Sequence, residues 1–367
     1  MEKLNTRYAR HYSLKDFGIE GQQKLKTAKV LVIGAGGLGC PVLQYLAAAG
    51  LGTIGIADGD TIALSNLQRQ ILYTTDDIGK PKTEAAASRL ESLNPEIVIK
   101  TYNVTITSAN ALEIISNYDI VVDCTDNFTA RYLINDACVV LGKGLVFGAI
   151  YQYEGQVAVF NIKDSEGNKT NYRHLFPTPP KPQEVPDCNE TGVIGVLPGI
   201  IGVIQASEVI KLIVGIGELL ISKLLTFSLL NYSTFIIDIT KDDSVNAMIP
   251  QNRVAFKETD YSRLCGMSVS GIEELDVSDF LKNRTSPDTI FIDVRESHEL
   301  LKSDFPNVNI PLSSFSEKIP ELTASNIILF CQSGKRSLKA GEMLLKKFGT
   351  SKKISHLKGG INALQER

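Results

Sequence analysis

Short apolar runs alternate with helical periodicity along the first two thirds of the chain. Residues 28–33 (AKVLVI) form an apolar run that ends in a glycine-rich turn, which is typical of a buried strand. A helical pattern follows over 39–49, and a second strand is predicted over 52–57. This order of strand, helix and strand predicts a βαβ unit.

The same alternation continues and predicts a series of further elements. Helices are expected at 83–93, 108–116 and 131–141, and strands at 96–102, 120–123, 144–148, 155–160, 224–229 and 235–239. The pattern predicts an α/β fold, a Rossmann-like doubly wound mixed sheet with an antiparallel end.

A second α/β pattern occupies the C-terminal part of the chain. It predicts strands at 289–293 and 326–330 and a helix at 338–347. The stretch before it, 241–267, is polar and weakly patterned, as in a linker. We therefore expect a first domain over 1–245, a linker over 246–270 and a smaller α/β domain over 271–367.

The longest apolar stretch, 192–217, contains Gln205, Glu208 and Lys211 and is expected to form a buried helix rather than a membrane span. The segment before it, 164–190, holds five of the 14 prolines. A segment of this length without helix or strand pattern predicts a functional crossover.

Composition narrows the classes of protein. The 367 residues are 43% hydrophobic and 22% charged, which suits two globular cores, and the net charge of −3 disfavours a nucleic-acid partner. The six cysteines are scattered, and no apolar segment typical of a secretory signal stands near the N-terminus. We therefore expect a cytoplasmic protein without a disulfide framework.

A candidate nucleotide site follows the first predicted strand. The glycines of Gly-Ala-Gly-Gly-Leu-Gly are Gly34, Gly36, Gly37 and Gly39, between a strand and a helix, where backbone N–H groups can bind phosphate. Asp58 follows the second strand, 19 residues after Gly39, at the place of a ribose-binding acid. These two features alone favour a dinucleotide dehydrogenase.

Charged residues further along favour a triphosphate instead. The run DGDTIALSNLQRQ brings Asn66 and Arg69, and Lys82 follows it. A triphosphate needs such cations for binding and for its transition state. Asp126, in Asp-Cys-Thr-Asp-Asn after a predicted strand, is a candidate ligand for Mg²⁺.

These motifs carry a family resemblance. RYAR, GAGGLG, DGDTIALSNLQRQ, GKPKTE and DCTDN occur in order from Arg7 to Ile239, and this part resembles the ubiquitin-activating superfamily, most closely the MoeB/ThiF-type adenylyltransferases. The resemblance implies ATP-dependent adenylation of the C-terminal glycine of a ubiquitin-like sulfur carrier protein. The attacking carboxylate is already an anion, so positioning and charge neutralisation suffice without a general base.

By this resemblance, ATP and its Mg²⁺ are held by Gly34, Gly36, Gly37, Gly39, Asp58, Asp60, Ser65, Asn66, Arg69, Lys82, Asp126 and Asn127. Arg69, Lys82 and Asp126 are expected to act in catalysis, and Asp126 to hold the metal. Arg10 is expected to reach the phosphates bound by the neighbouring subunit of a homodimer.

The resemblance also raises the questions of zinc and of a covalent cysteine. The family usually binds a structural zinc through two C-x-x-C pairs, but their places hold 171–174 (NYRH) and 262–265 (SRLC). Only His174 and Cys265 there bind zinc well, so we expect the zinc site to be lost. Cys188 lies in the crossover segment, where relatives form a covalent link to the carrier.

The C-terminal domain carries a second candidate site. Cys331 follows a predicted strand, and the loop Cys-Gln-Ser-Gly-Lys-Arg-Ser offers N–H groups and cations that favour a thiolate. With FIDVRE and HLKGG, it resembles a rhodanese-like sulfurtransferase domain. The resemblance implies a persulfide on Cys331, with Asp293 and Arg295 organising the loop.

The two resemblances together predict one activity. One domain would adenylate the carrier, and the other would supply sulfur to give a thiocarboxylate for molybdopterin or thiamine-thiazole biosynthesis. A sulfur donor such as a cysteine desulfurase would load Cys331. The alternatives are an NAD-dependent oxidoreductase, a non-catalytic scaffold that binds a ubiquitin-like protein, and a C-terminal domain that only docks.

Overall fold

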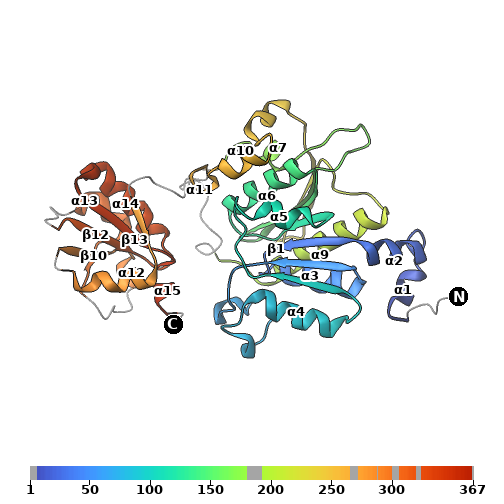
Figure 1. Cartoon of the computed structure of the whole chain (residues 1–367), viewed down its shortest axis with the longest axis horizontal. Coiled ribbons are helices and arrows are strands. Elements are labelled where there is room, and N and C mark those ends of the chain that lie inside the picture. Colours follow the sequence, from blue (N-terminus) through green and yellow to red (C-terminus); the bar gives the residue numbers. More distant parts are fainter. Residues whose placement is uncertain are drawn as a thin grey trace. The chain divides into compact units, whose positions relative to one another are not determined.

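The computed structural model describes residues 6–179, 192–264, 272–286, 288–299, 306–319 and 324–365. It divides into two compact units, the first unit Met1–Met267 and the second unit Ser268–Arg367, and each is described by itself (Figure 1).

A mixed sheet forms the centre of the first unit. Its strand order is β3-β2-β1-β4-β5-β6-β7-β8, parallel from β3 to β5 and antiparallel from β5 to β8. The strands are β1 (Lys29–Ile33), β2 (Thr53–Ala57), β3 (Val98–Tyr102), β4 (Ile120–Asp123), β5 (Gly144–Tyr151), β6 (Glu154–Phe160), β7 (Lys223–Ser228) and β8 (Thr234–Asp238). The prediction of a doubly wound mixed sheet with an antiparallel end is confirmed.

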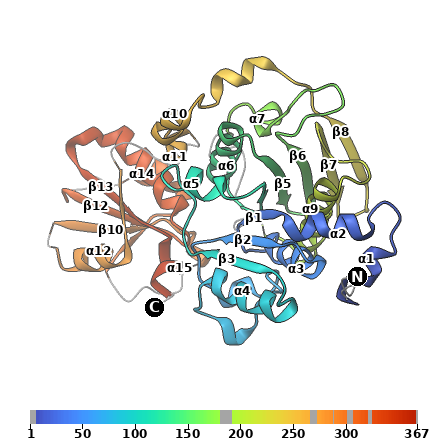
Figure 2. The same ribbon diagram turned by 45° about the vertical axis from the view of Figure 1, so that its right-hand side comes forward.

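Helices cover both faces of this sheet (Figures 1 and 2). The described helices are α1 (Ala9–Tyr12), α2 (Gly18–Thr27), α3 (Gly39–Ala49), α4 (Lys82–Leu93), α5 (Ala111–Ser116), α6 (Phe128–Leu141), α7 (Tyr172–Leu175), α9 (Val196–Val214), α10 (Arg253–Glu258) and α11 (Tyr261–Leu264).

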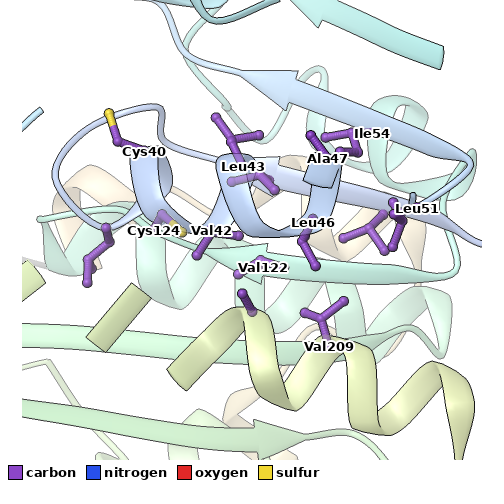
Figure 3. Packing of buried hydrophobic residues seen from close by; sticks show 14 of the residues in the cluster. Cys40, Val42, Leu43, Leu46, Ala47, Leu51, Ile54, Val122, Cys124 and Val209 are labelled. Atoms are coloured by element: carbon purple, nitrogen blue, oxygen red, sulfur yellow. The ribbon is translucent and has the colours of Figure 1, made fainter. Parts of the chain in front are cut away.

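Alternate residues of the central strands enter two separate cores. Val30 and Val32 of β1 join the cluster formed with α3 and α9, whereas Leu31 and Ile33 join the cluster formed with α5 and α6. Successive side chains of a strand point to opposite faces, so a strand buried on both faces is continuously apolar. Figure 3 shows Val122 of β4 in the first of these clusters, with residues of α3 and α9 around it.

Helix α9 is long and apolar enough to cross a membrane by length and composition alone. In this fold it packs along α2, α3, β5 and β6. Its buried polar groups have partners: Gln205 Nε2 donates to the Asp123 carbonyl at 2.8 Å, and Glu208 Oε2 accepts from the Leu220 N–H at 2.9 Å. The expected buried helix is therefore a core helix of the first unit.

Two glycines let α9 approach the sheet closely. A Cβ on Gly148 of β5 would overlap the side chain of Gln205, and one on Gly155 of β6 would overlap Ile201. Because glycine has no side chain, these two strand positions leave room for large side chains of the helix.

Residues expected to belong to a linker are folded into the first unit. Residues 243–248 form 3₁₀ turns, and α10 and α11 follow them. Phe256 and Tyr261 are buried in the cluster on the α6 side of the sheet. The expectation of a linker over 246–270 is therefore wrong for 246–264, because two aromatic anchors suffice to dock a polar stretch; 265–270 lie outside the described residues.

The second unit is a smaller parallel α/β structure. Its strand order is β11-β10-β12-β13-β9. The strands are β9 (Ile272–Leu275), β10 (Thr289–Asp293), β11 (Val308–Asn309), β12 (Asn326–Phe330) and β13 (Lys353–Leu357), and the described helices are α12 (Val277–Lys282), α13 (Phe315–Lys318), α14 (Lys335–Phe348) and α15 (Gly360–Gln365). The expected smaller α/β domain is confirmed.

Candidate functional site

A cavity of about 470 Å³ opens where the strand order of the first unit reverses, at the carboxyl ends of β1, β2 and β4. Open α/β sheets bind ligands at such a switch point. The cavity is lined by all the predicted nucleotide-binding residues except Gly39, namely Gly34, Gly36, Gly37, Asp58, Asp60, Ser65, Asn66, Arg69, Lys82, Asp126 and Asn127. The structure therefore brings together residues that span 94 positions of the sequence.

The glycine turn is held rigidly beneath the cavity. Gly34 has φ +95°, and a Cβ there would lie 2.7 Å from the Cys124 carbonyl oxygen. The Ala35 N–H donates to Asp58 Oδ2 at 2.7 Å, and the Tyr73 hydroxyl donates to the Ala35 carbonyl at 2.8 Å. The turn is thus shaped before a ligand arrives.

Asp58 organises this turn as well as facing the cavity. Its Oδ1 accepts from the Asp60 N–H at 2.8 Å, while Oδ2 holds Ala35. Burial raises the pKa of Asp58, and the positive charge of Lys82 opposes that rise. The carboxylate thus fixes the backbone of the glycine turn, and its contact with ribose hydroxyls stays a prediction.

The predicted cations stand on the cavity wall. Lys82 Nζ lies 2.7 Å from Asp60 Oδ2; the lysine side chain is 7% exposed and the aspartate 73%. Arg69 donates to the Ser65 carbonyl at 3.0 Å. A phosphate would compete with exposed Asp60 for Lys82, and displacing an exposed carboxylate costs little.

The acidic end of the cavity follows β4. Asn127 caps α6, because its Oδ1 accepts from the Ala130 N–H at 2.9 Å. Asp123 is buried and accepts from the Thr125 N–H and hydroxyl at 2.9 and 2.7 Å. Asp126 is exposed at the cavity, and its role as a ligand for Mg²⁺ stays a prediction.

Sequence reasoning missed Arg131, a further cation on the cavity wall. Its guanidinium carbon lies 5.4 Å from the Phe128 ring centre and 5.8 Å from that of Phe147. Within the described residues, Arg131 Nε and Gln70 Oε1 are buried without a hydrogen-bond partner. Such orphaned polar atoms in a cavity fit a polar ligand. The signal in the sequence was the arginine five residues after Asp126, in the first turns of a helix.

One further expected residue, Arg10, lies outside this cavity. Arg10 lies on α1, is exposed, and does not line the cavity of its own chain. Cys188 lies outside the described residues. Three other cysteines, Cys40, Cys124 and Cys138, are buried, and burial raises the pKa of each thiol, that of Cys40 to about 12. These three fit the expected packing role.

A buried ion pair involves the segment 171–174, where the first C-x-x-C pair of the family would fall. Arg173 of α7 donates to both carboxylate oxygens of Asp136 on α6, at 2.9 and 2.7 Å. The Tyr261 hydroxyl of α11 donates to the same carboxylate at 3.0 Å. Among the described residues no group of three His, Cys, Asp or Glu side chains could hold a metal. Cys265 lies outside them, so the expected loss of zinc stays a prediction.

The second unit places Cys331 at the carboxyl end of β12. Its Sγ accepts from the Gly334 N–H at 3.2 Å. Arg336 pairs with Glu299, with contacts of 2.5 and 2.9 Å, so its charge is shared with a carboxylate. Asp293 and Arg295 form a buried pair at 2.7 Å beside this loop, on the neighbouring strand β10 and just after it. That placement agrees with their expected organising role.

Comparison with known proteins assigns both units. The ThiF family matches residues 8–247, and the rhodanese-like domain matches 276–367. A sulfur carrier protein adenylyltransferase of Thermus thermophilus is 54% identical over 228 residues, which cover 62% of this chain and 84% of that protein. A probable adenylyltransferase/sulfurtransferase, MoeZ of Mycobacterium tuberculosis, is 39% identical over 371 residues, which cover 97% of this chain and 92% of that protein.

Solved structures support the same fold. MccB of E. coli, in a complex with MccA-N7isoASN, superposes with a TM-score of 0.56 at 23% identity over 66% of this chain and 73% of that chain. This likeness shows the fold alone, and the activity follows from the family models and the curated relatives. The chain belongs to the ThiF family and, with its rhodanese-like domain, is an adenylyltransferase with sulfurtransferase activity.

Proposed function

We propose that the chain uses ATP and Mg²⁺ to adenylate the C-terminal glycine of a ubiquitin-like sulfur carrier and then converts it to a thiocarboxylate. The observation that carries the proposal is one cavity where a glycine turn, three cations and Asp126 converge, in a chain that also bears the Cys331 loop. Family membership removes the oxidoreductase interpretation, which rested on the glycine turn and Asp58 alone.

Adenylation needs charge control more than proton transfer. A carboxylate oxygen of the carrier attacks the α-phosphorus of ATP, and pyrophosphate leaves with the electron pair of the broken P–O bond. Arg69, Lys82 and Arg131 stand on the cavity wall, where they offset the charge of the phosphates. Mg²⁺ held by Asp126 would add positive charge at the phosphates.

Sulfur transfer follows at the activated carbonyl. The outer sulfur of a Cys331 persulfide attacks the acyl carbon and expels AMP, which gives an acyl disulfide. A thiol then attacks the Cys331 sulfur, the thiocarboxylate leaves, and the thiol remains in a disulfide that a second thiol reduces. We propose Cys188 as a thiol that forms a covalent link on this path. A cysteine desulfurase is the proposed donor that loads Cys331.

The test is ATP–pyrophosphate exchange by the purified chain with Mg²⁺ and single carriers that end in Gly-Gly. Exchange that depends on one carrier supports the proposal, and the carrier then distinguishes molybdopterin from thiazole synthesis. Absence of exchange with every carrier, from folded protein that binds ATP, favours the non-catalytic scaffold.

Removing a cavity cation should slow adenylation. We expect Lys82→Met and Arg131→Met each to lower carrier-dependent exchange about 10²-fold, because each removes a preorganised charge near the phosphates. Arg89→Met is the matched control: Arg89 lies on α4 and pairs at the surface with Asp77 at 3.3 Å, so exchange should persist. Equal rates for all three variants would contradict the assigned cavity.

Arg10 offers a test of the proposed cytoplasmic homodimer. If Arg10 serves the neighbour's cavity, Arg10→Ala and Lys82→Met proteins each have little activity alone. After subunit exchange, mixed dimers hold one site with both substitutions and one with neither, so about a quarter of the activity should return. A mixture no more active than its components would place Arg10 elsewhere.

A further inference from the structure

The thiol of Cys331 is buried in the second unit. Its residue is 0% exposed. A thiol must lose its proton before it attacks sulfur. Since the thiol is buried, a protein group in contact with Sγ is the nearest group that can take this proton.

One such group is a hydroxyl that continues toward the surface. Cys331 Sγ lies 3.7 Å from Ser337 Oγ, in the first turn of α14. Ser337 Oγ lies 3.4 Å from His356 Nδ1 on β13. On the other side of the ring, His356 Nε2 lies 3.8 Å from Glu274 Oε2 on β9, and the Glu274 side chain is 47% exposed. The row of groups runs from a buried sulfur to a half-exposed carboxylate.

The imidazole is uncharged and so has one ring nitrogen without a hydrogen, which can accept a proton. Burial lowers the pKa of His356, against the pull of Glu274 and the Gly334 carbonyl, so the ring is neutral at pH 7. A hydrogen on Nε2, toward Glu274, leaves Nδ1 as an acceptor. The Ser337 hydroxyl donates to the Gly334 carbonyl at 2.8 Å and can turn about its Cβ–Oγ bond toward Nδ1.

Charged side chains near His356 and Cys331 have partners of opposite charge. Glu274 also pairs with Lys358 at 2.8 Å, and these are the two charges that act on the imidazole. Around the thiol, Arg336 is paired with Glu299 and Arg295 with Asp293, and Lys335 begins α14.

We propose that Ser337 and His356 form a proton relay that deprotonates Cys331, with the proton held on His356 beside Glu274. Ser337 takes the thiol proton as it passes its own to Nδ1. The relay acts on Cys331 through Ser337, so His356 is a positioning and proton-holding residue that does not touch the donor.

The relay supports a balanced sulfur transfer. The Cys331 thiolate attacks the outer sulfur of a persulfide donor, a new S–S bond forms as the donor's S–S bond breaks, and the donor leaves as a thiolate. The proton held by His356 returns to that thiolate. A thiol and a persulfide become a persulfide and a thiol, so no external oxidant or reductant is needed.

The test follows alkylation of Cys331 by iodoacetamide as a function of pH in the full chain, with the Cys331 peptide quantified by mass spectrometry. His356→Asn keeps a polar side chain but cannot hold a proton. We expect alkylation of Cys331 at pH 7 to be about tenfold slower, because the group that takes the proton is lost, and the difference should shrink as hydroxide takes over this role at higher pH. Ser337→Ala should slow alkylation by a similar factor.

Ser355→Ala is the matched control, because this neighbouring hydroxyl on β13 contacts Glu273 at 3.2 Å instead of the relay. A His356→Asn profile that superimposes on that of the unchanged protein, or that falls equally at every pH, overturns the relay. The inference rests on the proposed sulfur transfer, but alkylation uses neither ATP nor carrier. A failed relay and a failed carrier assay are therefore distinguishable.

Discussion

Replacing Cys331 with serine is expected to abolish thiocarboxylate formation while ATP–pyrophosphate exchange continues at its normal rate. The reason is chemical: a serine oxygen cannot carry the transferable sulfur, whereas the described residues proposed for adenylation all lie in the first unit. The measurement is the mass of the carrier after incubation with ATP and a persulfide donor, because oxygen replaced by sulfur adds ~16 Da. Exchange is followed in parallel.

Cys138→Ala serves as the control for loss of a buried thiol. Cys138 lies within α6, is fully buried, and does not line the cavity. Its removal should cost some stability but leave the thiocarboxylate yield intact. A full yield from Cys331→Ser would contradict the sulfur path and support a C-terminal domain that only docks.

Arg173→Met is expected to destabilise the first unit by about 3–5 kcal/mol, since it leaves Asp136 charged and buried. Asp136 is 0% exposed and otherwise receives Asn135 and Tyr261 as donors. The pair joins α7 and α11 to α6, the same two segments that carry the positions of the missing zinc pairs. We expect faster hydrogen exchange in α7 and α11, and a lower urea midpoint.

Two control variants accompany this experiment: one breaks a more exposed ion pair, and the other removes the charge that Arg173→Met leaves unpaired. Arg89→Met breaks an ion pair whose arginine is 48% exposed, and should cost less than about 1 kcal/mol. Adding Asp136→Asn to Arg173→Met removes the unpaired charge but keeps an acceptor for Tyr261, so part of the stability should return. If Arg173→Met unfolds no more easily than Arg89→Met, the ion pair does not hold these helices.

Much of the nucleotide site was predictable because its chemistry depends on short motifs next to strands. The glycines had to follow β1, and Asp58 and Asp126 had to follow β2 and β4, so strand prediction alone brought them to one edge. Gly39 is a partial exception: it lies beneath the turn, where a Cβ would overlap the Gly34 carbonyl oxygen, and it does not line the cavity.

The remaining features depend on contacts that no local pattern contains. Phe256 and Tyr261 are isolated aromatics in a polar stretch, and only the α6 face of the first unit explains their burial. No local sequence pattern distinguishes Arg131 from other arginines in helices, and only the structure shows its contacts with the rings of Phe128 and Phe147. His356 precedes the Leu-Lys-Gly-Gly turn, and its place beside Ser337 follows from the pairing of β13 with β12.

The close contact of α9 with the sheet has a consequence for mutational tolerance. Gly148 and Gly155 each lie against a large side chain of that helix, so even alanine would displace Gln205 or Ile201 from its buried position. A scan of all substitutions should therefore find these two sites as intolerant as the glycine turn, although neither lines the cavity. Intolerance in this chain thus marks close packing as well as chemistry, and only assays that separate folded yield from turnover will distinguish the two.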